Sequence, residues 1–170
     1  MAEQEKAQPN LTRVDPALSE LTRSLQNLRD AVIITEAGQG VVAFWNRAAE
    51  EMFGYRAGEA NGLPLERLMP ERMRPLHKAG LARYNSTGRG GYIEAGTPIQ
   101  LPAVTKDGVE ISIELTLTAL NELSVPGRYV LAIARDITER VREEQELRQS
   151  HARLQERLQG GSGAGSNEPA

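Results

Sequence analysis

Residues 109–120, VEISIELTLTAL, have the most regular pattern in the chain. Apolar and polar side chains alternate along this stretch, and the apolar positions are Val109, Ile111, Ile113, Leu115 and Leu117. Successive side chains of a strand point to opposite faces, so a period of two predicts a strand with one buried face and one solvated face. A strand of this kind is typical of an antiparallel sheet.

Further extended runs lie on both sides of this strand. Residues 31–45 contain two β-branched runs around the Gly-Gln-Gly turn at 38–40, which predicts a hairpin. Residues 92–104 and 127–137 predict two more strands. The chain then reads helix, two strands, several helices, three strands and helix, which predicts an α+β fold with an antiparallel sheet.

Capping residues, glycines and prolines indicate where the helices between the hairpin and the later strands begin and end. Asn46 is a suitable N-cap for a helix that stops at Gly54. Glycines and prolines interrupt residues 56–70, so only brief helical turns are expected there. Residues 71–87 predict a longer helix, with Gly88 just beyond its last turn.

Two further helices are expected to flank this domain. Residues 14–28 predict an amphipathic helix with a narrow stripe made of Leu18, Leu21, Leu25 and Leu28. Residues 138–159 predict a charged helix with a weak coiled-coil seam, which contains Ile137, Glu144, Leu147, His151, Leu154 and Leu158. Residues 1–13 are expected to be disordered, and the glycine-rich residues 160–170 to form a flexible tail.

The composition narrows the class of protein. The formal net charge is -3 with interleaved signs, so direct binding to nucleic acid is not expected. The chain has no cysteine, which removes thiolate nucleophiles, disulfides and the cysteine that blue-light flavin domains need. No apolar run suggests a signal peptide or a membrane span, so we expect a cytoplasmic protein. No nucleophile, base and carboxylate form a convincing set, so we expect no enzyme activity.

Three blocks of sequence resemble the PAS family. DAVIITEAGQGVVAFWNRAAEEMFGY at 30–55 resembles the opening of a PAS domain, TKDGVEISIELTLTAL at 105–120 its central hairpin, and RYVLAIARDITER at 128–140 its last strand. The resemblance implies a PAS domain at 29–137 with a five-stranded antiparallel sheet in the order 2-1-5-4-3 and helices on one face. It also implies a sensory or dimerising module, flanked by an N-terminal cap helix and a C-terminal signalling helix.

His77 is the main candidate for a functional side chain. On a helix over 71–87, it shares one face with Met73, Gly80, Leu81 and Tyr84. That face should point into the space between helix and sheet. An imidazole there would either ligate an iron centre or serve as a core histidine hydrogen-bonded to a carbonyl.

The segment LHKAGLARYNSTG at 76–88 resembles the haem-binding helix of FixL-type oxygen-sensing PAS domains. The resemblance puts His77 at the haem b ligand, Arg83 at an arginine that contacts a propionate, and Leu115 and Leu117, with Ile113, on the distal side. In that family an arginine on the distal side holds bound oxygen. Its position falls near Thr97 or Ile99 in this chain, and neither residue is an arginine. Without that donor, the resemblance implies CO or NO as the diatomic ligand in preference to stably held O2.

Four other kinds of residue have a possible functional role and also a simpler structural one. Trp45 and Asn46 would touch a flavin, or they would pack in the core and cap a helix; flavin is therefore the less favoured cofactor. Met69 or Met73 would be a second axial ligand or a gap-filler. His151 would be a kinase phosphoacceptor or a seam residue, and Ala152 follows it where that motif has an acidic residue.

The sequence therefore predicts a homodimeric PAS sensor that detects a gas through haem. Its coiled coil would pass the signal to a downstream kinase or another output domain, as in two-component or transcriptional regulation. The alternative is a PAS dimerisation module with a non-haem ligand or an empty pocket. A histidine-kinase fragment is a third hypothesis.

Overall fold

The computed structural model describes residues 16–120 and 127–161, so the expectations for residues 1–13 and 162–170 lie outside the described residues. The tail was expected to begin at residue 160, but residues 160 and 161 still belong to the last helix. The chain divides into two compact units, one up to Asp136 and one from Ile137 onward. The first unit contains the whole sheet, and the second consists of one helix within the described residues. The candidate site lies in the first unit.

The sheet has five antiparallel strands. They are β1 (Ala31–Glu36), β2 (Val41–Trp45), β3 (Ile99–Val104), β4 (Glu110–Leu120) and β5 (Tyr129–Asp136). Their order is β2-β1-β5-β4-β3, which confirms both the α+β class and the order implied by the family resemblance. Residues 110–120 of the alternating stretch form β4, which pairs with β5 on one side and β3 on the other. Val109 precedes the strand and is exposed, so its expected place on the buried face was wrong.

The β1–β2 hairpin contains a bulge that the sequence did not reveal. Ile34 pairs with Phe44 and Thr35 pairs with Val42, so Ala43 is the extra residue on β2. A bulge lets residues an odd number apart turn to the same side of a strand. Val42 and Trp45 therefore belong to the same core cluster.

The helices follow the predicted order. They are α1 (Pro16–Gln26), α2 (Arg47–Phe53), α3 (Ala57–Ala60), the 3-10 turns η2 (Leu65–Leu68) and η3 (Glu71–Met73), α4 (Arg74–Thr87), α5 (Gly91–Ala95) and α6 (Thr138–Gly161). The prediction for α4 is confirmed, and its C-cap Gly88 has a left-handed φ of 72°.

One predicted strand was partly wrong. Residues 91–95 form α5, and β3 begins only at Ile99. Tyr92 and Ile93 favour strands, but a glycine stands on either side of this segment. The Gly90 carbonyl accepts from the amides of Ile93 and Glu94, and Gly96 ends the turn at a φ of 60°. These local bonds outweigh the weak strand propensity of two side chains.

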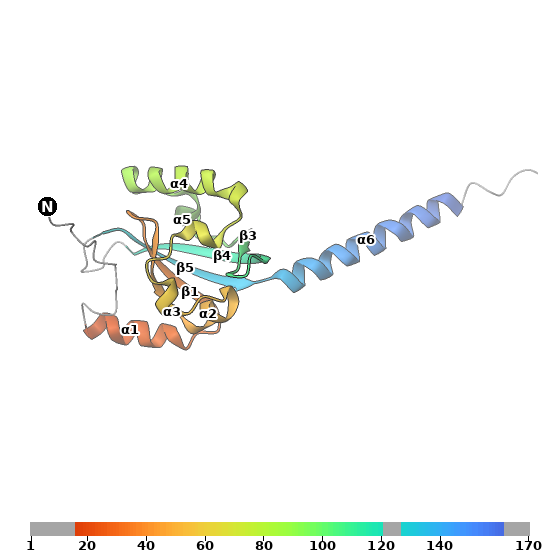
Figure 1. Ribbon diagram of the computed structural model, residues 1–170. Coiled ribbons are helices and arrows are strands. Elements are labelled where there is room, and N and C mark those ends of the chain that lie inside the picture. The colour runs from red at the N-terminus through yellow and green to blue at the C-terminus, as the bar shows by residue number, and fades with distance from the viewer. Residues whose placement is uncertain (1–15, 121–126, 162–170) are drawn as a thin grey trace, which may run out of the picture. The chain divides into compact units, whose positions relative to one another are not determined.

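The two faces of the sheet bury separate clusters. The larger cluster packs against α2, α3 and η2, and it includes Ile33, Trp45, Phe53, Ile111 and Ile113. A smaller cluster on the opposite face includes Val32, Ile34 and Phe44 and contacts Leu25 of α1. Figure 1 shows α4 and α5 on one side of the sheet and α1 on the other.

The second unit has the charged surface that the sequence predicted. Pairs of side chains one turn apart form ion pairs along α6, such as Arg142 with Glu146, whose Nε and Oε1 atoms are 3.0 Å apart. Leu147 and Leu154 of the predicted seam are 72% and 56% exposed. The side chain of Leu158 lies outside the described residues. Among the described helices, none is long and apolar enough to cross a membrane.

Candidate functional site

Helix α4 supplies the side chains of the candidate site. Its inner arc contains half-buried Met73, His77 and Leu81 and fully buried Tyr84. The prediction that these residues share a face is confirmed. Gly80 was wrongly placed on this face, because it is exposed with open space beside it. At 100° per residue Gly80 lies roughly 60° from His77, on the side of the helix away from Leu81.

The sheet carries an apolar surface on its helix-covered face. In the register of β3 and β4, Ile99 pairs with Leu115 and Leu101 pairs with Ile113. Ile113 is buried, whereas Ile99, Leu101, Leu115 and Leu117 keep intermediate exposure. Leu101 was missed by the sequence analysis, because only the strand register shows that it lies opposite Ile113.

Thr97 and Ile99, the two residues expected near the position of the distal arginine, lie in different surroundings. Thr97 precedes β3 and is exposed, whereas Ile99 is the first residue of the strand and pairs with Leu115. Ile99 therefore belongs to the apolar surface. Neither residue offers this surface a charged donor.

His77 has a buried ring nitrogen without a hydrogen-bond partner. The atom is Nδ1, and within the described residues the imidazole makes no hydrogen bond to a carbonyl. Burial lowers the pKa of His77 below its ordinary value, and the nearby Glu66 carboxylate opposes that shift. A neutral imidazole with a free lone pair can act as a metal ligand, whereas a core histidine usually satisfies its ring nitrogens.

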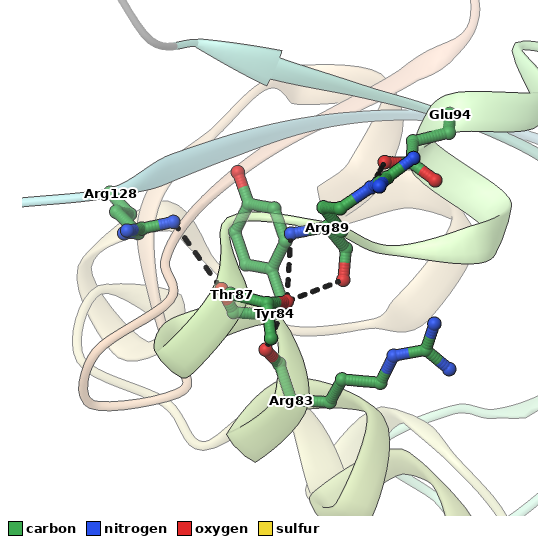
Figure 2. Close-up of polar contacts among 6 residues, drawn as sticks. All are labelled: Arg83, Tyr84, Thr87, Arg89, Glu94 and Arg128. Atoms are coloured by element: carbon green, nitrogen blue, oxygen red, sulfur yellow. Dashed lines mark hydrogen bonds and ion pairs between the residues drawn. The ribbon is translucent and has the colours of Figure 1, made fainter.

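The C-terminal end of α4 is firmly attached to the sheet. The Arg128 guanidinium donates from Nη1 to the Tyr84 carbonyl at 3.3 Å and lies 5.8 Å from the centre of the Tyr84 ring (Figure 2). Asn85 donates from Nδ2 to the Ala37 carbonyl at 2.7 Å. Tyr84 also packs with Ala37 and Val130. Tyr84 therefore has a clear packing role in addition to its place on the predicted face.

Arg83 lies on the solvent side of this helix. Its carbonyl accepts from the hydroxyl of Thr87 at 2.7 Å, and its guanidinium points away from Tyr84 and Arg128 (Figure 2). The guanidinium makes no ion pair within the described residues. The cation is thus available at the surface, about 120° around the helix from His77.

The flavin candidates are occupied by structural contacts. Trp45 is buried and donates from Nε1 to the Tyr55 carbonyl at 3.0 Å. Asn46 accepts at Oδ1 from the amides of Val32 and Ala49. Its Nδ2 donates to the carbonyls of Leu25 and Asp30 at 3.1 and 3.0 Å. The structure thus supports the packing and capping interpretation of both residues.

The other candidates are separate from this site or add little to it. His151 is exposed on α6, and Met69 is half-buried between η2 and η3. In the part of the chain that the structure describes, no group of three or more His, Asp or Glu side chains lies together as a metal site. A haem iron requires only one or two axial ligands from the protein.

Comparison with known proteins identifies the family to which this helix-covered sheet belongs. Residues 19–137 match the family described as PAS fold, so the chain belongs to the PAS family. This confirms the resemblance seen in the sequence.

Two characterised relatives are similar over most of this chain. The oxygen sensor protein DosP of Escherichia coli (strain K12) is 34% identical over 125 residues, which is 73% of this chain. The sensor protein FixL of Bradyrhizobium diazoefficiens is 30% identical over 132 residues, which is 78% of this chain. The chain spans only 15% of the first protein and 24% of the second.

The fold also resembles solved structures with other functions. An RNA-binding light-oxygen-voltage receptor has a TM-score of 0.59 and 21% identity, covering 85% of this chain and 40% of that one. At this identity the similarity shows the fold alone.

Proposed function

We propose that this PAS domain is a haem-based gas sensor with His77 as the axial ligand. The observation that carries the proposal is the buried Nδ1 atom of His77, which has no hydrogen-bond partner in the described residues. It lies on a half-buried helix face, in a chain that is similar to proteins named as an oxygen sensor and a sensor. A solely structural imidazole would be expected to satisfy that nitrogen.

The residues around His77 fit a flat apolar group with acidic edges. Met73, Leu81 and Tyr84 would contact it from α4, and the facing apolar surface consists of Ile99, Leu101, Ile113, Leu115 and Leu117. The free guanidinium of Arg83 would be available for a propionate at the edge. When bound, haem supplies an iron atom that binds diatomic gases.

The apolar surface also bears on which gas is detected. Bound O2 gains strongly from a hydrogen-bond donor, whereas CO depends much less on one. Of the two residues expected near the position of the distal arginine, Ile99 lies on the apolar surface without a donor, and Thr97 is exposed before β3. We therefore propose CO or NO as the physiological ligand in preference to stably held O2.

The signal would leave the domain through β5. Arg128, just before this strand, donates to a carbonyl near the C-terminal end of α4, and Ile137 alone links the end of the strand to α6. A ligand-dependent shift of α4 would therefore move a strand that is continuous with the output helix. The exposed Leu147 and Leu154 support a coiled-coil homodimer, which would pass the change to a kinase or another output domain.

The alternative is a PAS interaction module with a non-haem ligand or an empty pocket. The exposed Leu147 and Leu154 of α6 fit this alternative equally well, because a dimerisation module needs no haem. The hydrogen bonds already made by Trp45 and Asn46 argue against flavin in particular. The absence of enzyme activity and the cytoplasmic location remain predictions.

An absorption spectrum distinguishes the two functions. The protein is expressed with haem supplied, and its Soret band is compared with those of His77→Ala and of His151→Ala, which removes the other histidine. We expect the band in the wild type and in His151→Ala, and its loss or a large shift in His77→Ala. A wild type without a band, or a band unaffected by His77→Ala, would contradict the proposal.

A further inference from the structure

A second side chain at the N-terminal end of α4 has a buried polar atom without a partner. Arg74 lies one turn before His77, and its Nε atom is buried with no hydrogen bond in the described residues. At 100° per residue Arg74 and His77 lie roughly 60° apart, with Arg74 on the Leu81 side of His77, and both side chains are half-buried. Arg83 lies on the solvent side, so Arg74 is the better placed of the two cations.

The positive charge of Arg74 has only a weak counterion. Its Nη1 is 3.4 Å from Glu71 Oε1, and the Glu71 side chain is 88% exposed against 37% for Arg74. A solvated carboxylate at this distance compensates a half-buried guanidinium poorly. The carboxylates of Glu66 and Glu110 pair with other cations, Lys78 and Arg72 respectively.

We propose that Arg74 is a ligand-binding residue that holds a carboxylate of the molecule bound at His77. The Nε–H and Nη–H groups of arginine form a planar fork that matches the two oxygens of a carboxylate. A carboxylate there would satisfy the buried Nε–H and neutralise the guanidinium. This inference rests on the proposed haem function, in which the carboxylate is a haem propionate.

The test compares haem with its dimethyl ester, which lacks the carboxylates. Both are titrated into the wild type, Arg74→Gln and Arg74→Lys, and Arg72→Gln serves as a control that removes a nearby exposed cation. We expect Arg74→Gln to weaken haem binding roughly ten-fold or more, the usual effect of losing a charge-assisted hydrogen bond. Binding of the ester should be nearly unchanged, and Arg74→Lys should lie between the wild type and Arg74→Gln.

Two results would overturn the inference. Haem affinity could be the same in Arg74→Gln as in the wild type, or the variant could lose the same factor for haem and for the ester. Failure of the proposed function is distinct, because the wild type would then bind neither molecule through His77. The circular dichroism of each apo variant checks its folding, and Arg74→Lys, which keeps the charge, provides the same comparison if Arg74→Gln fails to fold.

Discussion

Two regions on the helix-covered side of the sheet differ in whether their buried polar groups have hydrogen-bond partners. Around α2, the Asn46 side chain makes four hydrogen bonds and the Trp45 indole makes one. At the N-terminal end of α4, His77 Nδ1 and Arg74 Nε are buried without partners. The polar groups of the first region are satisfied within the chain, whereas the second region contains buried polar atoms that the described residues leave unsatisfied.

The comparison teaches how to separate ligand residues from structural ones. Trp45, Asn46 and His77 all read as possible cofactor contacts in the sequence. Buried polar groups in folded proteins are normally satisfied, so the unsatisfied group is the one that calls for another explanation. By this criterion His77 is a ligand candidate, and the other two residues stabilise the fold.

The largest effect is expected from Asn46→Ala. This change removes four hydrogen bonds and leaves the buried amides of Val32 and Ala49 without acceptors. We expect the free energy of unfolding of the apo protein to fall by about 3 kcal/mol. Urea denaturation measures this, and a loss below about 1 kcal/mol would show that the region is not stabilised as described.

Addition of haem tests the region around His77, and here the expected change is a gain in the free energy of unfolding. A ligand that binds only the folded state stabilises it by about 2.7 kcal/mol when its free concentration is 100 times the dissociation constant. We expect this gain in the wild type and in Trp45→Phe, and its loss in His77→Leu. Equal stabilisation of all three proteins by haem would remove the distinction between the regions.

Trp45→Phe should have a moderate effect on the apo protein. The change removes the bond from Nε1 to the Tyr55 carbonyl but keeps an aromatic ring beside Phe53. We expect the free energy of unfolding to fall by about 1 kcal/mol. Tyr92→Phe is the matched control, because Tyr92 is exposed and its change should be nearly neutral. Similar losses in both variants would contradict the account.

The smallest effect is expected from His77→Leu in the apo protein. Replacing an unsatisfied buried imidazole by an apolar side chain removes a desolvation cost and loses no hydrogen bond. The free energy of unfolding should therefore stay within about 0.5 kcal/mol of the wild type or rise slightly. Thermal unfolding checks the result, and a large loss of stability would mean that His77 is a structural residue.

Much of the fold was readable because its signals are local. The alternation in 109–120 predicted β4, and Asn46 was recognised as an N-cap from its position before a helical run. The bulge at Ala43 was missed because it depends on the pairing of two strands. Helix α5 was missed because the flanking glycines outweighed the side chains between them.

The candidate site was predictable only in part for a similar reason. Helical periodicity placed His77 on the inner face, and the structure agrees. Its lack of a partner depends on which carbonyls come near in three dimensions, and a linear pattern does not contain that information. The roles of Leu101 and Arg74 likewise required the strand register and the burial of a single nitrogen atom.

The most direct test of His77 as the ligand uses the fact that the chain has only two histidines. His151→Gln leaves His77 alone, and this variant is labelled with 15N-histidine, loaded with haem and studied in the ferric state by electron–nuclear double resonance. We predict a hyperfine coupling from an axial imidazole 15N that is absent from unlabelled protein. Spectra that are identical with and without the label would contradict ligation by His77.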